Sequence, residues 1–383
     1  MSRHVLSLLA AVAFVTAQTP TPSPTPLFNQ HFPYGQQPYK VDDNPTGRGP
    51  QFGYNICNST TEGPNSDCQT ALMNHIDDFC LWAPPLPNST IGDTEAECVA
   101  WSTKPGHGTR IMPAGTLTGV QVLKAPNYIL FTATLNQQNL NLQPDDGGGE
   151  LDPHGADLRG NPLGSLVYSN AFPSNNGNNN SFQQVYQWHN YMGSGMACFK
   201  ICDPNVANSD IYCNNIFDRI GCNYVCPASY TPGEFTVCDS EDQDPPGVYT
   251  GSDGKTSTFS QPPESLGPIS TIPFTPRIPA TSNCVTYTSS LLYASQSSPS
   301  PTNSKGSSTG TSTGTGTGTV TSKPSGSTSK SGGSSSTQGS SKSGAASRSV
   351  NLPGASIWVA GSGVFVAMGM TLFAGLMTVV VAL

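Results

Sequence analysis

The densest group of side chains that could bind a metal ion or perform acid–base chemistry lies within residues 145–159. Gly147–Gly149 and Pro153 predict a loop there, in which neighbouring side chains can converge. Carboxylates in a flexible loop suit Ca²⁺, and an imidazole beside carboxylates suits Zn²⁺ or Mn²⁺. The loop is therefore a candidate divalent-metal site, although the spacing follows neither the EF-hand order nor H-E-x-x-H. The candidate ligands are Glu150, Asp152, His154 and Asp157.

The same loop also has a purely structural interpretation. Asp152 and Asp157 can cap turns, and Arg159 can pair with a carboxylate, which would give an acidic surface loop without a ligand. If the loop does bind a metal, the protein is a metal-dependent enzyme or a carbohydrate-binding module that acts on wall polysaccharide. That interpretation is the alternative to the one reached at the end of this section.

Other residues suited to catalysis or ligand binding stand alone in the sequence. His107 and His189 could act as general bases, but a lone histidine is more often structural. No G-x-S-x-G motif occurs in the region expected to fold, which argues against a serine hydrolase. Aromatic side chains could stack on sugar rings, although most aromatics belong to cores. The candidates are Trp82, Trp101, Trp188 and Tyr191.

The N-terminus has the features of a secretory signal peptide. Basic residues at positions 3 and 4 precede an apolar run at 5–15, and small residues lead to cleavage after Ala17. We therefore assign residues 1–17 to the signal peptide and expect an exported protein. Residues 18–26 alternate Thr, Ser and Pro and predict an extended spacer.

The C-terminus has the features of a GPI-attachment signal. Residues 357–383 are almost wholly apolar and carry no charged side chain, and a spacer with small residues precedes them. The candidate attachment residues are Ser343, Gly344 and Ala345, so residues 344–383 form the signal. A single transmembrane helix is the alternative, but such a helix usually carries Lys or Arg on its cytoplasmic side.

Two parts of different composition lie between these signals. Residues 289–343 are rich in Ser, Thr and Gly and predict a disordered stalk that carries O-glycans. Residues 27–288 form the expected folded ectodomain, which contains all 24 acidic but only 10 basic residues. Such an acidic body argues against nucleic acid as a partner. Three N-x-S/T sequons in turn-rich sequence predict N-glycosylation at Asn58, Asn88 and Asn179.

The ectodomain sequence favours a β-rich fold with minor helices. Residues 116–123 and 128–135 alternate apolar and polar or are β-branched, and 164–168 and 182–188 are further strand candidates. Apolar spacing predicts helices at Ser66–Trp82 and Ser209–Ile220. All 11 cysteines lie between residues 57 and 284, and in an exported chain this argues for disulfide bonds. Because the number is odd, at least one thiol stays unpaired within the chain.

Several strings resemble those of the basidiomycete macrophage-activating glycoproteins, which are mannoprotein-like. Examples are GYNICNSTTEGPNSDCQT, GGELDPHGADLRGNPLGSLVYSNAFP and DQDPPGVYTGSDGKTSTFSQPPESLGPIS. In that family a Cys is common near Ser102, and position 226 is usually not Cys. The resemblance therefore implies that Cys226 is the free thiol. The remaining disulfide candidates are Cys57, Cys68, Cys80, Cys98, Cys198, Cys202, Cys213, Cys222, Cys238 and Cys284.

Together these features predict an extracellular glycoprotein that a GPI lipid tethers to the membrane or the cell wall. The resemblance implies a fungal surface protein without assigned enzymatic chemistry, in a structural, surface-contact or immunostimulatory role. Its expected partners are the membrane, wall polysaccharide or host-cell receptors. No cofactor is required by this interpretation, and the one candidate is a divalent metal, Ca²⁺, Mn²⁺ or Zn²⁺, in the acidic loop.

Overall fold

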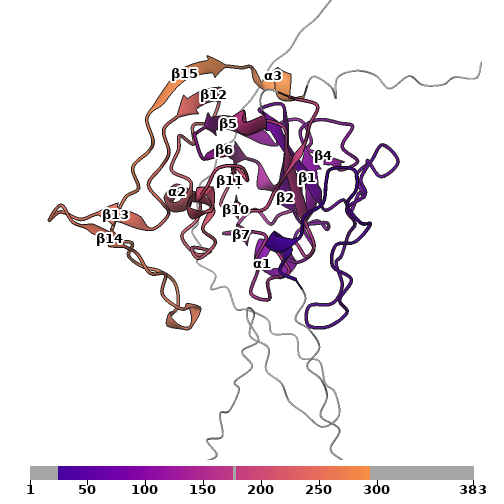
Figure 1. Ribbon diagram of the computed structural model, residues 1–383, viewed down its shortest axis with the longest axis horizontal. Helices are drawn as coiled ribbons and strands as arrows, with labels where there is room; N and C mark the ends of the chain where they lie inside the picture. Colours follow the sequence, from indigo (N-terminus) through magenta and orange to yellow (C-terminus); the bar gives the residue numbers. More distant parts are fainter. Residues whose placement is uncertain (1–24, 176–177, 294–383) are drawn as a thin grey trace, which may run out of the picture. The chain divides into compact units, whose positions relative to one another are not determined.

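Two β-sheets form the framework of the fold, as seen in a computed structural model that describes residues 25–175 and 178–293 (Figure 1). The first sheet contains β1 (Thr70–His75), β2 (Asp78–Ala83), β3 (Val99–Ser102), β4 (Arg110–Ile111), β8 (Leu166–Ser169) and β9 (Gln183–Val185). Its six strands run in the order β4-β3-β2-β1-β8-β9.

The second sheet has seven strands in the order β15-β12-β5-β6-β11-β10-β7. They are β5 (Leu117–Lys124), β6 (Tyr128–Leu135), β7 (Gly149–Leu151), β10 (Trp188–Gly193), β11 (Met196–Cys202), β12 (Phe235–Ser240) and β15 (Thr281–Thr286). Most neighbours are antiparallel, but β12 runs parallel to β5. A separate pair, β13 (Val248–Thr250) and β14 (Thr256–Thr258), projects from the rest (Figure 1).

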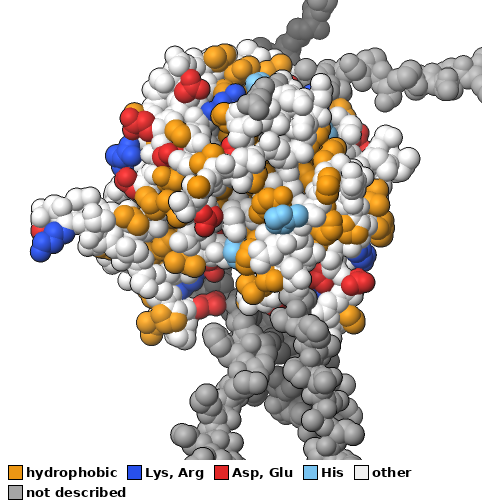
Figure 2. Space-filling model, in the orientation of Figure 1, with side chains coloured by type: hydrophobic (Ala, Val, Ile, Leu, Met, Phe, Trp, Pro, Cys, Tyr) orange, Lys and Arg blue, Asp and Glu red, His pale blue; other side chains and the backbone are white. Residues whose placement is uncertain are grey.

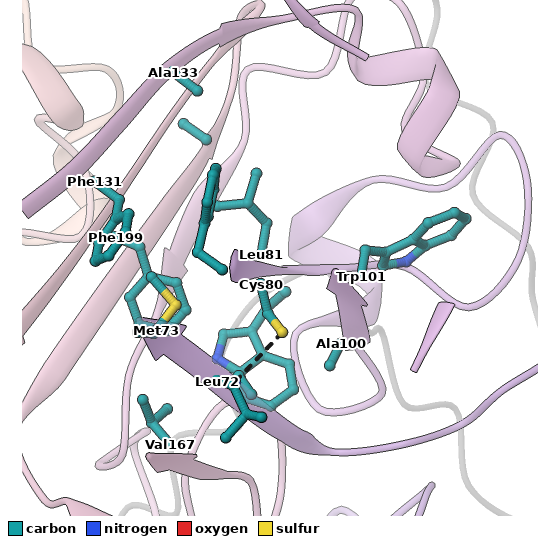
Figure 3. Close-up of a cluster of buried hydrophobic side chains, with 14 of the residues drawn as sticks. Leu72, Met73, Cys80, Leu81, Ala100, Trp101, Phe131, Ala133, Val167 and Phe199 are labelled. Atoms are coloured by element: carbon teal, nitrogen blue, oxygen red, sulfur yellow. Dashed lines mark hydrogen bonds between the residues drawn. The ribbon is translucent and has the colours of Figure 1, made fainter. Parts of the chain in front are cut away.

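The two sheets pack face to face around one apolar core. The rings of Phe79 on β2 and Phe131 on β6 lie 5.2 Å apart, and those of Trp82 and Trp188 lie 6.1 Å apart. Figure 3 shows side chains of both sheets, among them Met73 and Phe131, within this shared core. Burial of such large apolar side chains, at roughly 25 cal/mol per Å², is the main force that holds the sandwich together.

The opposite face of the seven-stranded sheet is also buried. Residues 203–228, which we call the cover segment, lie over it and form a second apolar cluster with side chains of β5, β6 and β11. Two disulfide bonds, Cys202–Cys213 and Cys198–Cys222, join the cover segment to β11. In Figure 1, α2 of the cover segment lies on the side of β10 and β11 away from β1 and β2.

The helices are all short. They are η1 (Leu27–Asn29), α1 (Ile91–Thr94), η2 (Gln137–Leu140), η3 (Pro173–Asn175), η4 (Ser209–Cys213), α2 (Cys222–Val225), η5 (Glu264–Leu266) and α3 (Ser289–Leu292), where η marks a 3-10 helix. Within the described ranges, none of them has the length and apolar character to cross a bilayer. The predicted signal peptide, most of the spacer and stalk, and the GPI signal lie outside the described residues.

The β-rich fold class is confirmed, and the strands expected at 116–123 and 128–135 are β5 and β6. The helix predicted over Ser66–Trp82 is wrong, because this stretch contains β1 and β2. Nearly every residue of these two strands is buried, so their apolar positions have no period of two and imitate the spacing of a helix.

The helix predicted over Ser209–Ile220 is also wrong in extent. The structure has only the 3-10 turn η4, which ends where Asn214 takes an extended conformation, and α2 begins after Gly221. The folded part also continues beyond its expected end at residue 288. Leu292 and Tyr293 are buried in the core, and the Tyr293 hydroxyl accepts a hydrogen bond from the Leu117 amide.

Eight cysteines form four disulfide bonds: Cys57–Cys68, Cys198–Cys222, Cys202–Cys213 and Cys238–Cys284. Cys80 and Cys98, which we expected to be bridged, carry free buried thiols, so that expectation is corrected. The residue opposite Cys80 on the neighbouring strand is Ser102, whose hydroxyl lies 2.9 Å from the Cys80 sulfur. Cys226, the residue expected to be unpaired, is also a free buried thiol.

Ser102→Cys should close a fifth disulfide bond with Cys80. The two residues face each other across antiparallel strands at a non-hydrogen-bonded pair, because the Thr103 amide bonds the Phe79 carbonyl next to them. Closing this loop should raise the free energy of unfolding by about 3 kcal/mol. Intact-mass analysis and thiol titration under denaturing conditions should find two free thiols instead of three. Four free thiols would contradict the strand register, and Ser102→Ala is the control.

Candidate functional site

The four candidate metal ligands of residues 145–159 do not converge. Asp152 accepts hydrogen bonds from the amides of His154 and Gly155, so its carboxylate caps a turn. The His154 ring stacks on Phe28, and its Nε2 lies 2.9 Å from the side-chain oxygen of Gln187.

Asp157 and Arg159 belong to a separate network of ion pairs. Asp157 pairs with Arg48, and Arg159 forms a bidentate pair with Asp42 at 2.6 and 3.0 Å. Across the described ranges, no three or more His, Cys, Asp and Glu side chains form a group that could hold a metal ion. The expectation that Glu150, Asp152, His154 and Asp157 share a metal is therefore corrected. Asp152 and Asp157 cap turns and Arg159 pairs with a carboxylate, as the structural interpretation expected of these three residues.

The four aromatic residues considered for sugar binding are core residues. Trp82 and Trp188 are completely enclosed between the sheets, and Trp101 and Tyr191 are also buried. His107 pairs with Asp78, with 2.5 Å between Nε2 and the carboxylate. None of these four aromatic side chains therefore offers a flat surface to a polysaccharide.

Instead, the structure brings together a buried polar row on the outer face of the seven-stranded sheet. Tyr191 on β10 is directly opposite Glu150 on β7, and His189 on β10 is directly opposite Lys200 on β11. Residues opposite each other across strands share a face, so all four side chains point toward the cover segment. Cys226 completes the row from that segment, with its sulfur 3.5 Å from His189 Nε2.

Lys200 is fully buried yet completely satisfied. Its ammonium donates to the carbonyls of Tyr212 and Val225, at 3.2 and 2.6 Å, and to the Gln243 side chain at 2.6 Å. Three acceptors match the three protons of an ammonium group, although burial lowers the pKa of Lys200 to about 8. Two of these acceptors belong to the cover segment, so the buried charge ties that segment to the sheet.

Cys226 and His189 form a neutral pair beside this charge. Burial raises the pKa of the Cys226 thiol to about 11, and Lys200 opposes the shift. Burial, with a smaller effect of Lys200, lowers the pKa of His189 well below its usual value. At neutral pH the sulfur is therefore a thiol, which is a poor nucleophile.

Glu150 occupies the other end of the row. Burial, together with the charges of Asp152 and Asp218, raises the pKa of its carboxyl well above the usual value. Tyr191 and Asp218 both face this carboxyl, and both line a surface pocket of about 420 Å³. The row therefore approaches the surface only at its acidic end.

The sequence analysis named four residues of this row, but it did not place them together. Glu150 was a candidate metal ligand, His189 a candidate general base and Tyr191 a candidate for sugar stacking. Cys226 was the expected free thiol. Lys200 was missed altogether. Its sequence signal is a Lys within the alternating run Met196–Cys202, where it shares a face with Cys198 and Cys202. A charged residue between two cysteines on one strand face indicates a covered, polar face.

Comparisons with known proteins place the chain in a family. Appressorium protein ROW2 of the fungus Mycosarcoma maydis is 38% identical over 219 residues, 56% of this chain and 72% of that relative. Appressorium protein ROW1 of the same organism is 38% identical over 224 residues, 58% of this chain. The match covers 51% of ROW1, so the chain spans about half its length. The chain belongs to the family of these fungal appressorium proteins.

No family model matches the chain, and neither does any solved structure. The relatives found are appressorium proteins rather than macrophage-activating glycoproteins, so that finer resemblance stays a prediction. What the comparisons establish is membership in a family of fungal appressorium proteins.

A separate carboxyl, Glu95, should make the protein more stable in acid than in base. Burial, and then the charge of Asp152, raises its pKa from 4.5 to about 7. As pH rises, the unfolded state loses this proton at a lower pH than the folded state does. The free energy of unfolding should therefore fall as pH rises from 4.5 to about 7. Glu95→Gln should remove this loss and raise the free energy of unfolding near pH 8 by up to about 3 kcal/mol.

Urea unfolding of the wild type and the variant across this pH range measures the effect. Glu97→Gln, at an exposed carboxyl two residues further along, is the control and should leave the pH profile unchanged. Parallel profiles for the wild type and Glu95→Gln would contradict the account of Glu95.

Proposed function

We propose that the protein is a GPI-anchored surface glycoprotein that acts by contact, rather than by catalysis, on fungal infection structures. The observation that carries this proposal is the similarity to two appressorium proteins, one of which the chain matches over 72% of its length. The signal peptide and the GPI-attachment signal expected from the sequence support export and anchoring.

The distribution of polar and apolar groups supports a contact role. His189, Lys200 and Cys226, the side chains best suited to catalysis, are completely buried. By contrast, large apolar side chains are exposed, among them Tyr39 and Leu86. Figure 2 shows hydrophobic side chains spread over one face, with few Lys and Arg among them. These exposed side chains are the groups available for contact with another surface.

The three sequons support a glycosylated head. Asn58, Asn88 and Asn179 are all exposed, so each amide is accessible to the glycosylation machinery. The proposed partners are the membrane, through the GPI lipid, and wall polysaccharide. Contact with host-cell receptors, and through it stimulation of host immune cells, is a finer form of the same role.

A tagged full-length protein should appear on the surface of infection structures, and a phosphatidylinositol-specific phospholipase should release the membrane-bound fraction. Deletion of residues 357–383 should send the protein into the medium, because the attachment signal is lost. Deletion of residues 300–322 of the stalk is the control and should leave anchoring intact. A mature protein that retains residues 357–383 would contradict the GPI anchor, and an intracellular tag would contradict the surface role.

A further inference from the structure

Three adjacent buried side chains of the polar row have atoms without partners. Among the described residues, both carboxyl oxygens of Glu150, the Nδ1 atom of His189 and the Tyr191 hydroxyl have no partner in good hydrogen-bond geometry, although Tyr191 and Asp218 both approach the Glu150 carboxyl. Buried polar atoms are nearly always satisfied, and each unsatisfied one is destabilising. Several such atoms side by side indicate that a ligand belongs between them.

The spacing of these atoms suits a shared metal ion. His189 Nδ1 and a Glu150 oxygen lie 3.6 Å apart, too far for a good hydrogen bond. Two ligands about 2.1 Å from a tetrahedral metal ion are separated by roughly 3.4 Å. The Tyr191 hydroxyl faces the same Glu150 carboxyl and supplies a third oxygen or nitrogen ligand.

The charges around these atoms favour a cation over a water molecule. The carboxyls of Asp152 and Asp218 lie near that of Glu150, so negatively charged groups that repel one another gather around these atoms. A positive ion would relieve this repulsion, whereas a neutral water would not. The ammonium of Lys200 faces Cys226, which contacts the other ring nitrogen of His189, Nε2.

One of the three residues borders a surface pocket. Tyr191 lines the pocket of about 420 Å³, together with Gly147–Gly149 and Asp218. Asp218 is exposed at this pocket and faces the Glu150 carboxyl, so it stands between solvent and the buried ligands. Entry of an ion would therefore begin at Tyr191 and Asp218, because Glu150 and His189 lie behind the lining of this pocket.

We propose that Glu150, His189 and Tyr191 bind one divalent transition-metal ion, of the Zn²⁺ or Mn²⁺ class, which enters through the pocket at Asp218. A mixed set of imidazole and oxygen ligands suits these ions better than Ca²⁺. This set shares only Glu150 with the group expected from the sequence, and its third ligand is a tyrosine.

The secreted full-length protein, purified without chelators, should contain close to one such ion per chain by elemental mass spectrometry. After EDTA treatment, Zn²⁺ or Mn²⁺ added to about 100 times its Kd should raise Tm by roughly 5–10 °C. Tyr191→Phe keeps the buried ring and removes only the hydroxyl, so it should fold and bind the metal about 10- to 100-fold more weakly. Glu150→Gln should abolish binding.

Asp157→Asn is the matched control, because Asp157 lies in the same acidic stretch of sequence but pairs with Arg48 outside the proposed site. It should bind the metal like the wild type. If Glu150→Gln fails to fold, Tyr191→Phe still decides the matter. A metal-free protein whose Tm ignores both ions would overturn the proposal and leave a buried water as the bridge. Binding unchanged in Tyr191→Phe would also overturn it, because the ion would then lie elsewhere.

Discussion

Burial of one β-sheet on both of its faces is the constraint on which the rest of this structure depends. Strand β11 shows it most clearly, since Ala197, Phe199 and Ile201 face the sandwich core while Cys198, Lys200 and Cys202 face the cover segment. The first face needs only apolar partners. The second carries a charge and two sulfur atoms, so it needs specific acceptors and disulfide partners. The cover segment supplies both.

This requirement explains why a segment with little regular structure is held so firmly. Residues 203–228 contain only η4 and α2, and their own backbone bonds would not keep them in place. Two disulfide bonds and the ammonium of Lys200 fix them to β11 instead. The same arrangement excludes solvent from His189 and Cys226 and leaves only the Glu150 end of the row beside the surface.

The sequence predicted the strands whose apolar residues alternate with polar ones or are β-branched, because these patterns have one interpretation. Strands β5 and β6 were predicted because their residues alternate or are β-branched. Strands β1 and β2 were mistaken for a helix, because burial on both faces removes the period of two. Cys80 was wrongly assigned to a disulfide because the positions of the cysteines in the sequence do not reveal that its neighbour across the strands is a serine, Ser102.

The candidate site was predictable only in its residue types. Glu150 was correctly singled out, but its neighbours in sequence were taken for its neighbours in space. Asp152 and His154 are close to Glu150 in sequence, but their side chains contact other residues. Tyr191 and His189 are distant in sequence but lie beside Glu150, because β7 pairs with β10. That register depends on long-range pairing, which no local pattern in this sequence specifies. The role of Lys200 in holding the cover segment can be recognised only from the structure, which shows the three acceptors of its ammonium group.

The central claim is that the buried ammonium of Lys200 holds the cover segment on the sheet. Hydrogen exchange of the full-length protein with Lys200→Met tests it most directly, with Lys124→Met on β5 as the control. Loss of the charged hydrogen bonds should speed amide exchange in residues 209–226 by about 10- to 100-fold, while β5 and β6 stay protected. Unchanged exchange in residues 209–226 of a folded Lys200→Met protein would contradict the claim.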